Sequence, residues 1–319
     1  MITRSIKSMM IGGAILFGLA MCFTSCEGAL DDIFGEWDKP SANASGESTP
    51  SSDPTPSGGG ETPADPLATP LTLEVLTAGT IVVNNPKSGM QYSTDGGVTK
   101  TTMTATTTIP TTGELAVGTK VEFYGTAPRY NGTKFGGTAD VKVYGNIMSL
   151  LSPTGFADNK ELTADHTFYQ LFFSYTHLKD ASNLFLPAET LTSSCYDQMF
   201  QNCNSLTAAP ALPAESLANY CYFGMFEGCS SLTTAPKLPA TTLTTQCYYG
   251  MFQNCTSLTN AYVKAAYVNT VYECADMFDG CTAAGTKTLH TTNASKGSWD
   301  TAITNESWAG WTTANDWTD

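Results

Sequence analysis

The sequence has few charged residues and almost no arginine. Asp, Glu, Lys and Arg make up 14% of the 319 residues, well below the roughly 25% that is typical of soluble proteins. Only two arginines are present, Arg4 and Arg129. With a formal net charge of −14 and no cluster of basic side chains, the chain lacks the positive surface that binds nucleic-acid phosphates. We therefore expect no nucleic-acid partner.

Histidines and enzyme motifs are scarce as well. The three histidines, His166, His177 and His290, are scattered along the chain, and no phosphate-binding loop or GxSxG motif occurs. Asp276 and Asp279 are too few to complete a calcium-binding loop. We therefore expect a protein without enzymatic activity, cofactor or bound metal.

The N-terminus has the pattern of an export signal. A short basic start is followed by an apolar run from Met9 to Phe23, which is shorter than the ~20 residues that a membrane-spanning helix needs. The run ends in FTSC, which resembles a lipobox, so we expect residues 1–25 to be a lipoprotein signal peptide. The resemblance implies cleavage before Cys26 and a diacylglycerol group on its thiol. Ordinary secretory cleavage is the alternative.

Residues 26–70 combine an acidic leader with a stretch rich in Pro, Ser and Gly. From Pro40 to Pro70 no aromatic residue occurs, so this segment cannot bury enough apolar surface to fold and is expected to be a disordered tether. The sequence DDIFGEW after Cys26 resembles the acidic leader of surface lipoproteins from Bacteroidetes. That resemblance implies an outer-membrane lipoprotein, exposed on the cell surface and held to the membrane by the lipid on Cys26.

Residues 71–145 carry the period-two alternation of half-buried strands. Leu71, Leu73 and Val75 alternate with polar residues, and a later apolar stretch leads into the turn signal TDGG. Several short strands at this spacing predict a small antiparallel β-sandwich-like domain. Arg129 and its loop fit a ligand-binding edge, but also an ordinary solvated loop, so the residues predict no function for this domain.

Residues 146–281 contain an internal repeat of 26 residues. Three full units begin at Cys195, Cys221 and Cys247, with a degenerate copy before them and a truncated copy from Cys274. A unit of this length forms one turn of a solenoid, with a short parallel strand and a helical or irregular return. We expect the Met-Phe pair that follows each first cysteine to lie in the core shared by neighbouring units.

The repeat pattern CxSLTxxxxLPxxxLxxxCYxxMF resembles the BspA-like leucine-rich repeat of surface proteins from Treponema and Bacteroidetes. The resemblance implies a leucine-rich-repeat solenoid and a role in adhesion to host or bacterial proteins. The Trp-rich tail, residues 282–319, is similar to parts that accompany these repeats, and we expect it to cap the last unit. The expected fold is therefore mixed: a small antiparallel β-sandwich-like domain followed by a leucine-rich-repeat solenoid.

Eight cysteines remain when Cys22 and Cys26 are set aside. Two lie in each full unit and two in the truncated copy: Cys195, Cys203, Cys221, Cys229, Cys247, Cys255, Cys274 and Cys281. The degenerate copy has Thr167 and Tyr175 at the aligned positions, so both cysteines are missing together. Their C-x7-C and C-x6-C spacings do not match the closer pairs of zinc sites. Because export implies an oxidising compartment, we predict a disulfide within each unit; a buried ladder of free thiols is the alternative.

The first functional hypothesis is a non-enzymatic surface lipoprotein whose solenoid binds a macromolecular partner, namely a host or bacterial surface protein. The predicted contact face consists of the variable positions beside the core pairs: Asp197, Gln198, Gln201, Asn202, Tyr222, Phe223, Glu227, Tyr248, Tyr249, Gln253 and Asn254. Aromatic and amide side chains together suit a polar, wettable interface. An ordinary solvated surface has the same composition and is the competing interpretation.

The alternative hypothesis is a glycan-binding accessory lipoprotein, in which residues 71–145 bind sugar and the repeats act as a spacer. The strand domain has no tryptophan, whereas four of the five tryptophans crowd the tail, where a sugar platform competes with a cap. The sequence Asp300-Thr301-Ala302 resembles the three-residue O-glycosylation site of Bacteroidetes, which makes Thr301 a candidate modification site.

Overall fold

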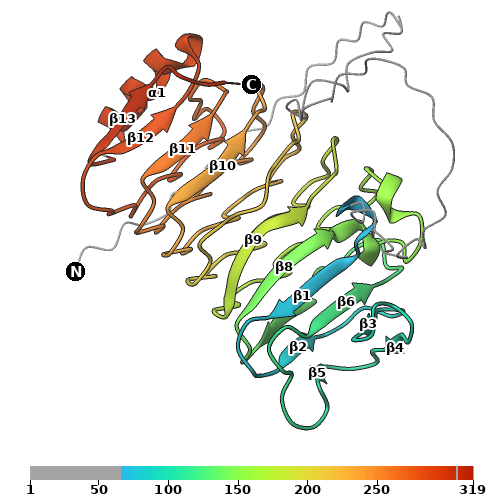
Figure 1. Ribbon diagram of the computed structural model, residues 1–319. Coiled ribbons are helices and arrows are strands. Elements are labelled where there is room, and N and C mark those ends of the chain that lie inside the picture. The colour runs from blue at the N-terminus through green and yellow to red at the C-terminus, as the bar shows by residue number, and fades with distance from the viewer. Residues whose placement is uncertain (1–65, 307, 319) are drawn as a thin grey trace, which may run out of the picture. The chain divides into compact units, whose positions relative to one another are not determined.

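Residues 71–146 fold into short strands in two sheets, as their alternating pattern predicts (Figure 1). Leu71, Leu73 and Val75 are buried along β1. The six-stranded sheet has the order β4 (Thr101–Thr102), β3 (Gln91–Ser93), β6 (Lys120–Tyr124), β1 (Leu71–Val75), β8 (Val141–Asn146) and β9 (Leu178–Phe185). The three-stranded sheet has the order β5 (Thr107–Ile109), β2 (Ile81–Asn84) and β7 (Lys134–Gly137). Neighbouring strands are antiparallel except β8 and β9, which are parallel.

The computed structural model describes residues 66–306 and 308–318, which belong to one compact unit. The predicted signal peptide, the lipidation site Cys26 and most of the predicted tether lie outside the described residues. The prediction of disorder up to residue 70 is wrong at its end, because Pro66–Ala68 form a short 3-10 helix and the Asn146 N–H donates to the Thr69 carbonyl (2.8 Å). These contacts with β8 offset the cost of ordering the segment.

The strand segment and the repeats share one hydrophobic core. On one side, β9 pairs with β8, and the Ala181 N–H donates to the Ala208 carbonyl of the next unit (2.9 Å). On the other side, the Phe135 N–H of β7 donates to the Leu171 carbonyl (2.8 Å). Both sheets of the strand segment therefore lead directly into the repeats, and the core continues across the predicted boundary at residues 145 and 146.

The later units contribute a parallel sheet. Its order is β10 (Thr234–Leu238), β11 (Asn260–Val263), β12 (Lys287–His290) and β13 (Trp311–Ala314). Pro236 lies inside β10, and the register with β11 shifts at this point because proline has no N–H to donate. With three sheets and few helices, the fold is mixed and sheet-rich, as expected.

The opposite side of each unit is a regular run of turns. We call these the turn segments: residues 166–174, 194–202, 220–228, 246–254 and 272–280. The first, fifth and ninth residue of each has a positive φ of 52–72°. Alternate N–H groups donate three residues back, as Met199 does to Tyr196 (3.2 Å), and the others donate to the next segment, as Gln198 does to Phe223 (2.8 Å). The returns are thus regular turns, and the expectation of helical or irregular returns is wrong.

The ninth position of the turn segments shows how closely neighbouring units fit. Asn202, Gly228, Asn254 and Gly280 alternate along the stack. A Cβ atom on Gly228 would collide with the Asn202 side chain, and one on Gly280 would collide with Asn254. Because left-handed backbone costs most residues about 1–2 kcal/mol and is least unfavourable for Gly and Asn, this alternation meets both the steric and the conformational requirement.

Aromatic rings stack at equivalent positions of successive turn segments. The phenylalanine ladder, with centroid separations of 5.4–6.0 Å and interplanar angles of 1–7°, consists of Phe172, Phe200, Phe226, Phe252 and Phe278. A second ladder, with separations of 5.7 and 6.2 Å, consists of Tyr196, Tyr222 and Tyr248. The expected Met-Phe core is confirmed: the phenylalanines of the ladder are buried, and so are Met199, Met225, Met251 and Met277.

The tail covers the last rung of the phenylalanine ladder. The helix α1 (Asn293–Asn305) begins at Thr292, whose side-chain oxygen accepts the Ser295 N–H (3.1 Å). The buried rings of Trp299, Trp308 and Trp311 lie 4.4–6.3 Å from Phe278, centroid to centroid. The ladder therefore ends against tryptophans rather than in water.

The eight repeat cysteines are free and buried, so the predicted disulfides within each unit are wrong. The two cysteines of a unit have different neighbours. The second one donates its Sγ–H to the preceding unit, as Cys229 does to the Phe200 carbonyl (3.1 Å). The first one lies beside its equivalents: burial raises the pKa of the Cys221 thiol, and the nearby Cys195 and Cys247 thiols raise it further. The cysteines thus pack along the stack as small apolar groups. Burial raises the pKa of the Cys195 thiol to about 12, so this group stays uncharged.

These thiols should be inert in the folded protein. For the chain from residue 27 onward, we expect dithionitrobenzoate at pH 8 to label none of the eight repeat cysteines, because only exposed thiolates react. In guanidinium chloride without reductant, all eight should react. If none reacts in the denaturant before a reductant is added, the cysteines are paired and the free-thiol ladder is contradicted.

Removing one rung should weaken the whole stack. Phe226 lies 5.5 Å from Phe200 and 5.8 Å from Phe252, so Phe226→Ala should lower the free energy of unfolding by about 3–5 kcal/mol. The exposed control Val117→Ala should change it by less than about 0.5 kcal/mol. Urea unfolding followed by circular dichroism measures both changes. An equal change in the free energy of unfolding for the two variants would show that the ladder does not stabilise the core.

Candidate functional site

The side chains of the turn segments that point away from the core form one surface, which we call the turn face. Most of the predicted contact residues lie on it, half-buried or exposed: Asp197, Gln198, Asn202, Phe223, Glu227, Tyr249, Gln253 and Asn254. Side chains connect neighbouring units across this face. The Gln170 amide donates to Gln198 (2.6 Å), and the Gln201 amide donates to Glu227, which leaves Gln201 buried.

The predicted contact face is wrong for Gln201, which is buried, and for Tyr222 and Tyr248. Both rings are buried in the tyrosine ladder, 2% and 0% exposed. They follow the first cysteine directly, and in these segments the inward residues come in consecutive pairs, first Cys-Tyr and then Met-Phe. The sequence pattern CY therefore marks a core position, whereas the next residue, Phe223 or Tyr249, is the one that reaches the surface.

The aromatic part of the turn face is larger than the sequence predicts. Phe223 and Tyr249 stack with centroids 4.9 Å apart and planes 3° apart. Tyr220 is 37% exposed and Tyr272 is 59% exposed. Both tyrosines occupy the first position of their turn segments, where the intervening unit has Gln246. The signal for these positions is an alignment on the Met-Phe pairs, since Tyr220, Gln246 and Tyr272 each lie five residues before the methionine.

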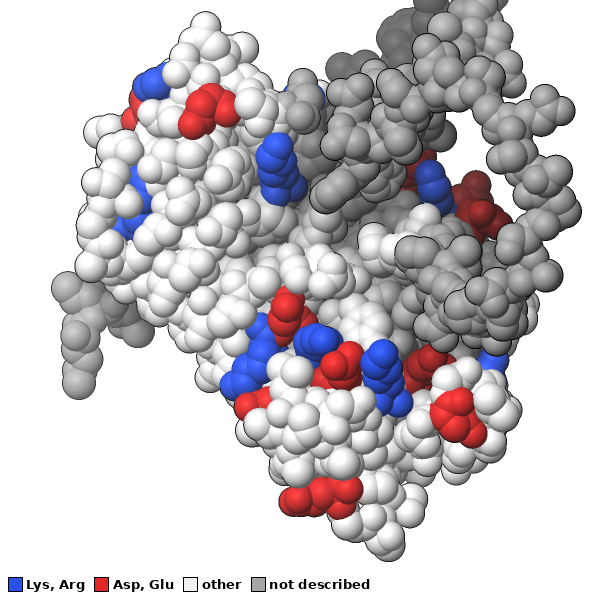
Figure 2. Space-filling view, in the orientation of Figure 1, with Lys and Arg blue, Asp and Glu red and all other residues white. Residues whose placement is uncertain are grey.

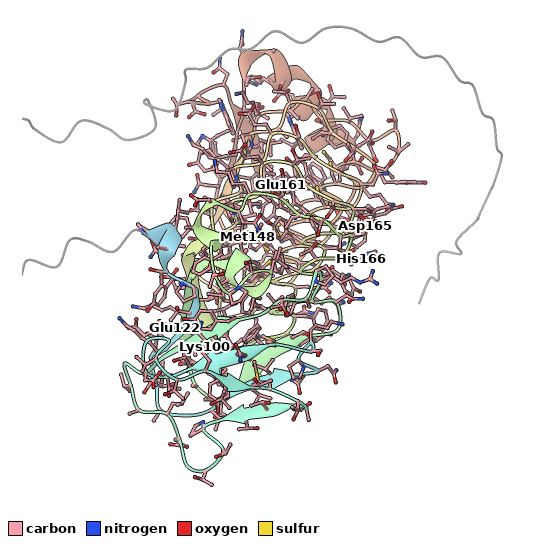
Figure 3. The ribbon with its side chains drawn as sticks, turned by 90° about the vertical axis from the view of Figure 1, so that its right-hand side faces the viewer. Lys100, Glu122, Met148, Glu161, Asp165 and His166 are labelled. Atoms are coloured by element: carbon pink, nitrogen blue, oxygen red, sulfur yellow. The ribbon has the colours of Figure 1, made fainter. Side chains whose placement is uncertain are left out.

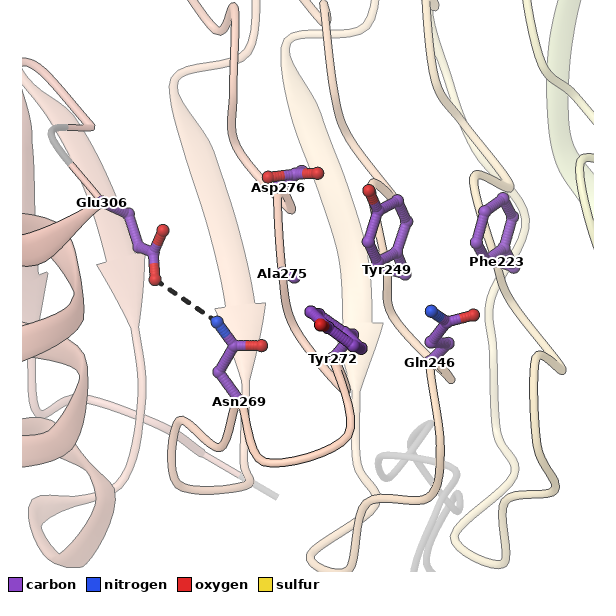
Figure 4. Close-up of a pocket in the computed structure, with 8 residues that line it drawn as sticks. All are labelled: Phe223, Gln246, Tyr249, Asn269, Tyr272, Ala275, Asp276 and Glu306. Carbon is purple, nitrogen blue, oxygen red and sulfur yellow. Dashed lines mark hydrogen bonds between the residues drawn. The ribbon is translucent and has the colours of Figure 1, made fainter. Parts of the chain in front are cut away.

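A groove of about 470 Å³ lies at the end of the aromatic part, next to the tail (Figure 4). Three consecutive turn segments, the loop before the last of them and the end of α1 contribute its walls. The lining residues are Phe223, Gln246, Tyr249, Asn269, Tyr272, Ala275, Asp276 and Glu306. Asn269 lies just before the last turn segment, whereas Glu306 is far from the repeats in sequence and only the fold brings it to this place.

Two carboxylates determine the electrostatics of the groove. The Tyr249 hydroxyl donates to Asp276, and this hydrogen bond, with burial and the nearby acids, raises the pKa of Tyr249 to about 12. Glu306 accepts from the Tyr267 hydroxyl (2.7 Å) and from the Asn269 amide (3.4 Å, Figure 4). None of the eight lining residues is Lys, Arg or His, so the groove presents negative charge beside an aromatic wall.

Asp197 is a second unusual carboxylate on the turn face. Burial raises the pKa of its side chain to about 7. A hydrogen bond with Ser194 favours the charged form and lowers the pKa, but it does not outweigh the effect of burial. One of its oxygens is buried without a hydrogen-bond partner. Asp197 occupies the same column as Phe223 and Tyr249, so an ionisable group takes the place of an aromatic ring here.

Among the residues that the structure describes, the other titratable side chains do not converge on a catalytic arrangement. His177 pairs with Asp140 (2.8 Å) and His290 pairs with Asp316 (2.8 Å), at separate places. Figure 3 labels Lys100 and Glu122, which both contact Tyr124, and further along the chain Glu161, Asp165 and His166. In residues 66–306 and 308–318, no three His, Cys, Asp or Glu side chains lie close enough together to hold a metal ion.

A second, smaller pocket lies on the six-stranded sheet. Figure 2 shows acidic and basic side chains interspersed over this sheet, while most of the remaining surface in view is uncharged. The pocket has a volume of about 280 Å³ and includes Glu74, Lys120, Lys142 and Asp180. Lys142 pairs with Glu74 (3.1 Å), so opposite charges on this surface already pair with each other.

Thr301 is exposed on α1, and its hydroxyl donates to the Gly297 carbonyl (3.0 Å). Its neighbour Asp300 is bound to Lys296 (2.7 Å), and Ala302 is buried. The candidate modification site is therefore accessible at the threonine itself.

Among the described residues, no helix combines the length and apolar character that a membrane crossing requires.

A scan against protein-family models, a search of curated proteins and a search of solved structures found no match to this chain.

The raised pKa of Asp197 predicts a pH-dependent stability. In the folded state the carboxyl keeps its proton up to about pH 7, whereas in the unfolded chain it ionises near 3.8, so its contribution to stability is lost as the pH rises through 7. Asp197→Asn should therefore be near neutral at pH 4 and stabilising at pH 8, by about 1–2 kcal/mol after allowance for partial exposure. Urea unfolding at both pH values measures the difference. A variant that stabilises equally at pH 4 and pH 8 would contradict the assignment.

Proposed function

We propose that the chain is a non-enzymatic surface lipoprotein, held in the outer membrane by a lipid on Cys26. Its units form a BspA-like leucine-rich-repeat solenoid, which binds a protein on a host or bacterial surface through the turn face. The observation that carries this proposal is the group of exposed and half-buried aromatic side chains on the turn face: Tyr220, Phe223, Tyr249 and Tyr272. Amide side chains flank this group, and a groove lies at its end.

The composition of the turn face supports binding rather than simple solvation. Tyrosine and phenylalanine supply large contact areas at low cost in side-chain entropy, and they are enriched in protein interfaces. Tyr220 and Tyr272 are two of the few large apolar side chains that the described residues leave exposed. Their rings lie on the same face as Phe223 and Tyr249, so the exposed aromatic area is concentrated and not scattered.

The glycan-binding alternative receives less support from the geometry. Of the tyrosines in residues 71–145, Tyr124 and Tyr130 are buried, which removes two of the rings that a sugar would stack on. In the tail, Trp299, Trp308 and Trp311 are buried against Phe278. A sugar platform on either segment would need open aromatic faces.

The test is a binding screen of the chain from residue 27 onward against immobilised extracellular-matrix proteins and a glycan array. We expect binding to at least one protein, with affinity reduced at least tenfold in the double variant Phe223→Ser/Tyr249→Ser, because interface aromatics carry most of the binding energy. The control Val98→Ser/Val117→Ser removes two exposed apolar side chains, 84% and 66% exposed, outside the turn face and should bind like the parent.

The outcomes separate the two hypotheses. Protein binding that is lost only in the turn-face variant supports the proposal. Glycan binding that persists in that variant favours the accessory-protein alternative, and the absence of any binding contradicts both.

A further inference from the structure

On the turn face, the outward stack of Phe223 and Tyr249 has no ring at the equivalent position of the last turn segment. Phe223 covers one face of the Tyr249 ring, at 4.9 Å and 3°. On the other side, the equivalent position of the next turn segment is Ala275. Beneath it, the phenylalanine ladder continues without a gap, since Phe252 and Phe278 lie 6.0 Å apart. The units therefore stay in register here, although the outward ring is replaced by Ala275 and the ring of the tyrosine ladder by Cys274.

The groove occupies the place of this missing ring. In Figure 4, Ala275 lies below Asp276 and above Tyr272, with Tyr249 on one side and Glu306 on the other. A group that enters the groove meets an open tyrosine face, a methyl group and two carboxylates. The spacing of the ladder, about 5 Å from ring to ring, suits a flat group stacked on Tyr249.

The charges select the kind of flat group that fits. Asp276 and Glu306 line the groove from different elements, and no basic side chain lines it. Glu227 and Asp279 also act on Tyr249 through their charge. A cation is therefore favoured, and the guanidinium of arginine is the one protein side chain that is flat, always charged and able to stack on a ring while donating to carboxylates. Lysine carries its charge on a compact ammonium, which does not fill a flat slot.

We propose that the groove beside Ala275 binds an arginine side chain of the partner protein, stacked on Tyr249 and paired with Asp276 and Glu306. This inference rests on the proposed function, because it names the chemistry by which the turn face recognises its partner. The chain itself is poor in arginine, with only Arg129 among the described residues, so the complementary charge comes from the partner.

The experiment uses N-acetyl-arginine amide as the probe and the Ala275 methyl signal as the reporter. In the chain from residue 27 onward, labelled with ¹³C in its alanine methyl groups, the signal of Ala275 should shift and saturate at about 1–10 mM probe, as expected for a single side chain. The exposed Ala211 methyl should not move. N-acetyl-citrulline amide has the same shape without the charge and should leave the signal of Ala275 in place.

Two variants test the contacts. Asp276→Asn keeps the hydrogen bond with Tyr249 and suits the positive φ of 56°, so it should fold and weaken the probe about tenfold. As a matched control, Glu215→Gln removes an exposed carboxylate outside the turn face and should leave the affinity unchanged. Ala275→Tyr fills the missing rung with the residue that the preceding unit carries there, and saturation transfer from this variant to the probe should be lost.

Other results would overturn the inference. A shift of Ala275 with methyl glucoside but not with the arginine probe would make the groove a sugar site, and no shift with either would leave it without a ligand of the proposed kind. Because the titration needs no partner, its failure is distinct from that of the proposed function: a negative screen with a positive titration contradicts only the function.

Discussion

The hydrogen bonding between successive turn segments is the constraint on which the rest of the structure depends. Every second amide of a segment donates to the next unit, as those of Tyr196 and Gln198 do to Cys221 and Phe223. These bonds fix the register of the units, so equivalent residues lie above one another. Stacked phenylalanines, stacked tyrosines and two sets of buried cysteines all follow from that register. The same bonds give partners to backbone N–H and C=O groups of the turn segments, which have no helix or strand hydrogen bonds.

The register also separates structural from functional positions. Inward residues must match their neighbours in size, which is why Met225 and Phe226 reappear as Met251 and Phe252. Outward residues meet water on one side and tolerate change, so the same column holds Asp197, Phe223, Tyr249 and Ala275 in turn. A binding surface can therefore vary from unit to unit while the core stays constant. The groove beside Ala275 is the consequence of one such change at the last repeat.

Much of this arrangement could be predicted from the sequence, but not all of it. The 26-residue period, the buried Met-Phe pairs and the strands of residues 71–145 follow from spacing and alternation alone. The prediction of disulfides failed because cysteine spacing does not reveal that each thiol packs against the neighbouring unit. Tyr222 and Tyr248 were misplaced because the turn segments bury residues in consecutive pairs, a pattern that neither a helix nor a strand template describes. Glu306 could not be predicted as a site residue, since only the return of the tail over the last unit brings it to the groove.

The central claim, that hydrogen bonds between turn segments hold the units in one cooperative stack, is tested most directly by residue-resolved hydrogen exchange of the folded chain. The amides of Tyr196, Gln198 and Phe200 should exchange as slowly as those of β1, because they open only when the whole stack unfolds. If these amides exchange orders of magnitude faster while β1 remains protected, the turn segments open independently of the sheets, and the account is contradicted.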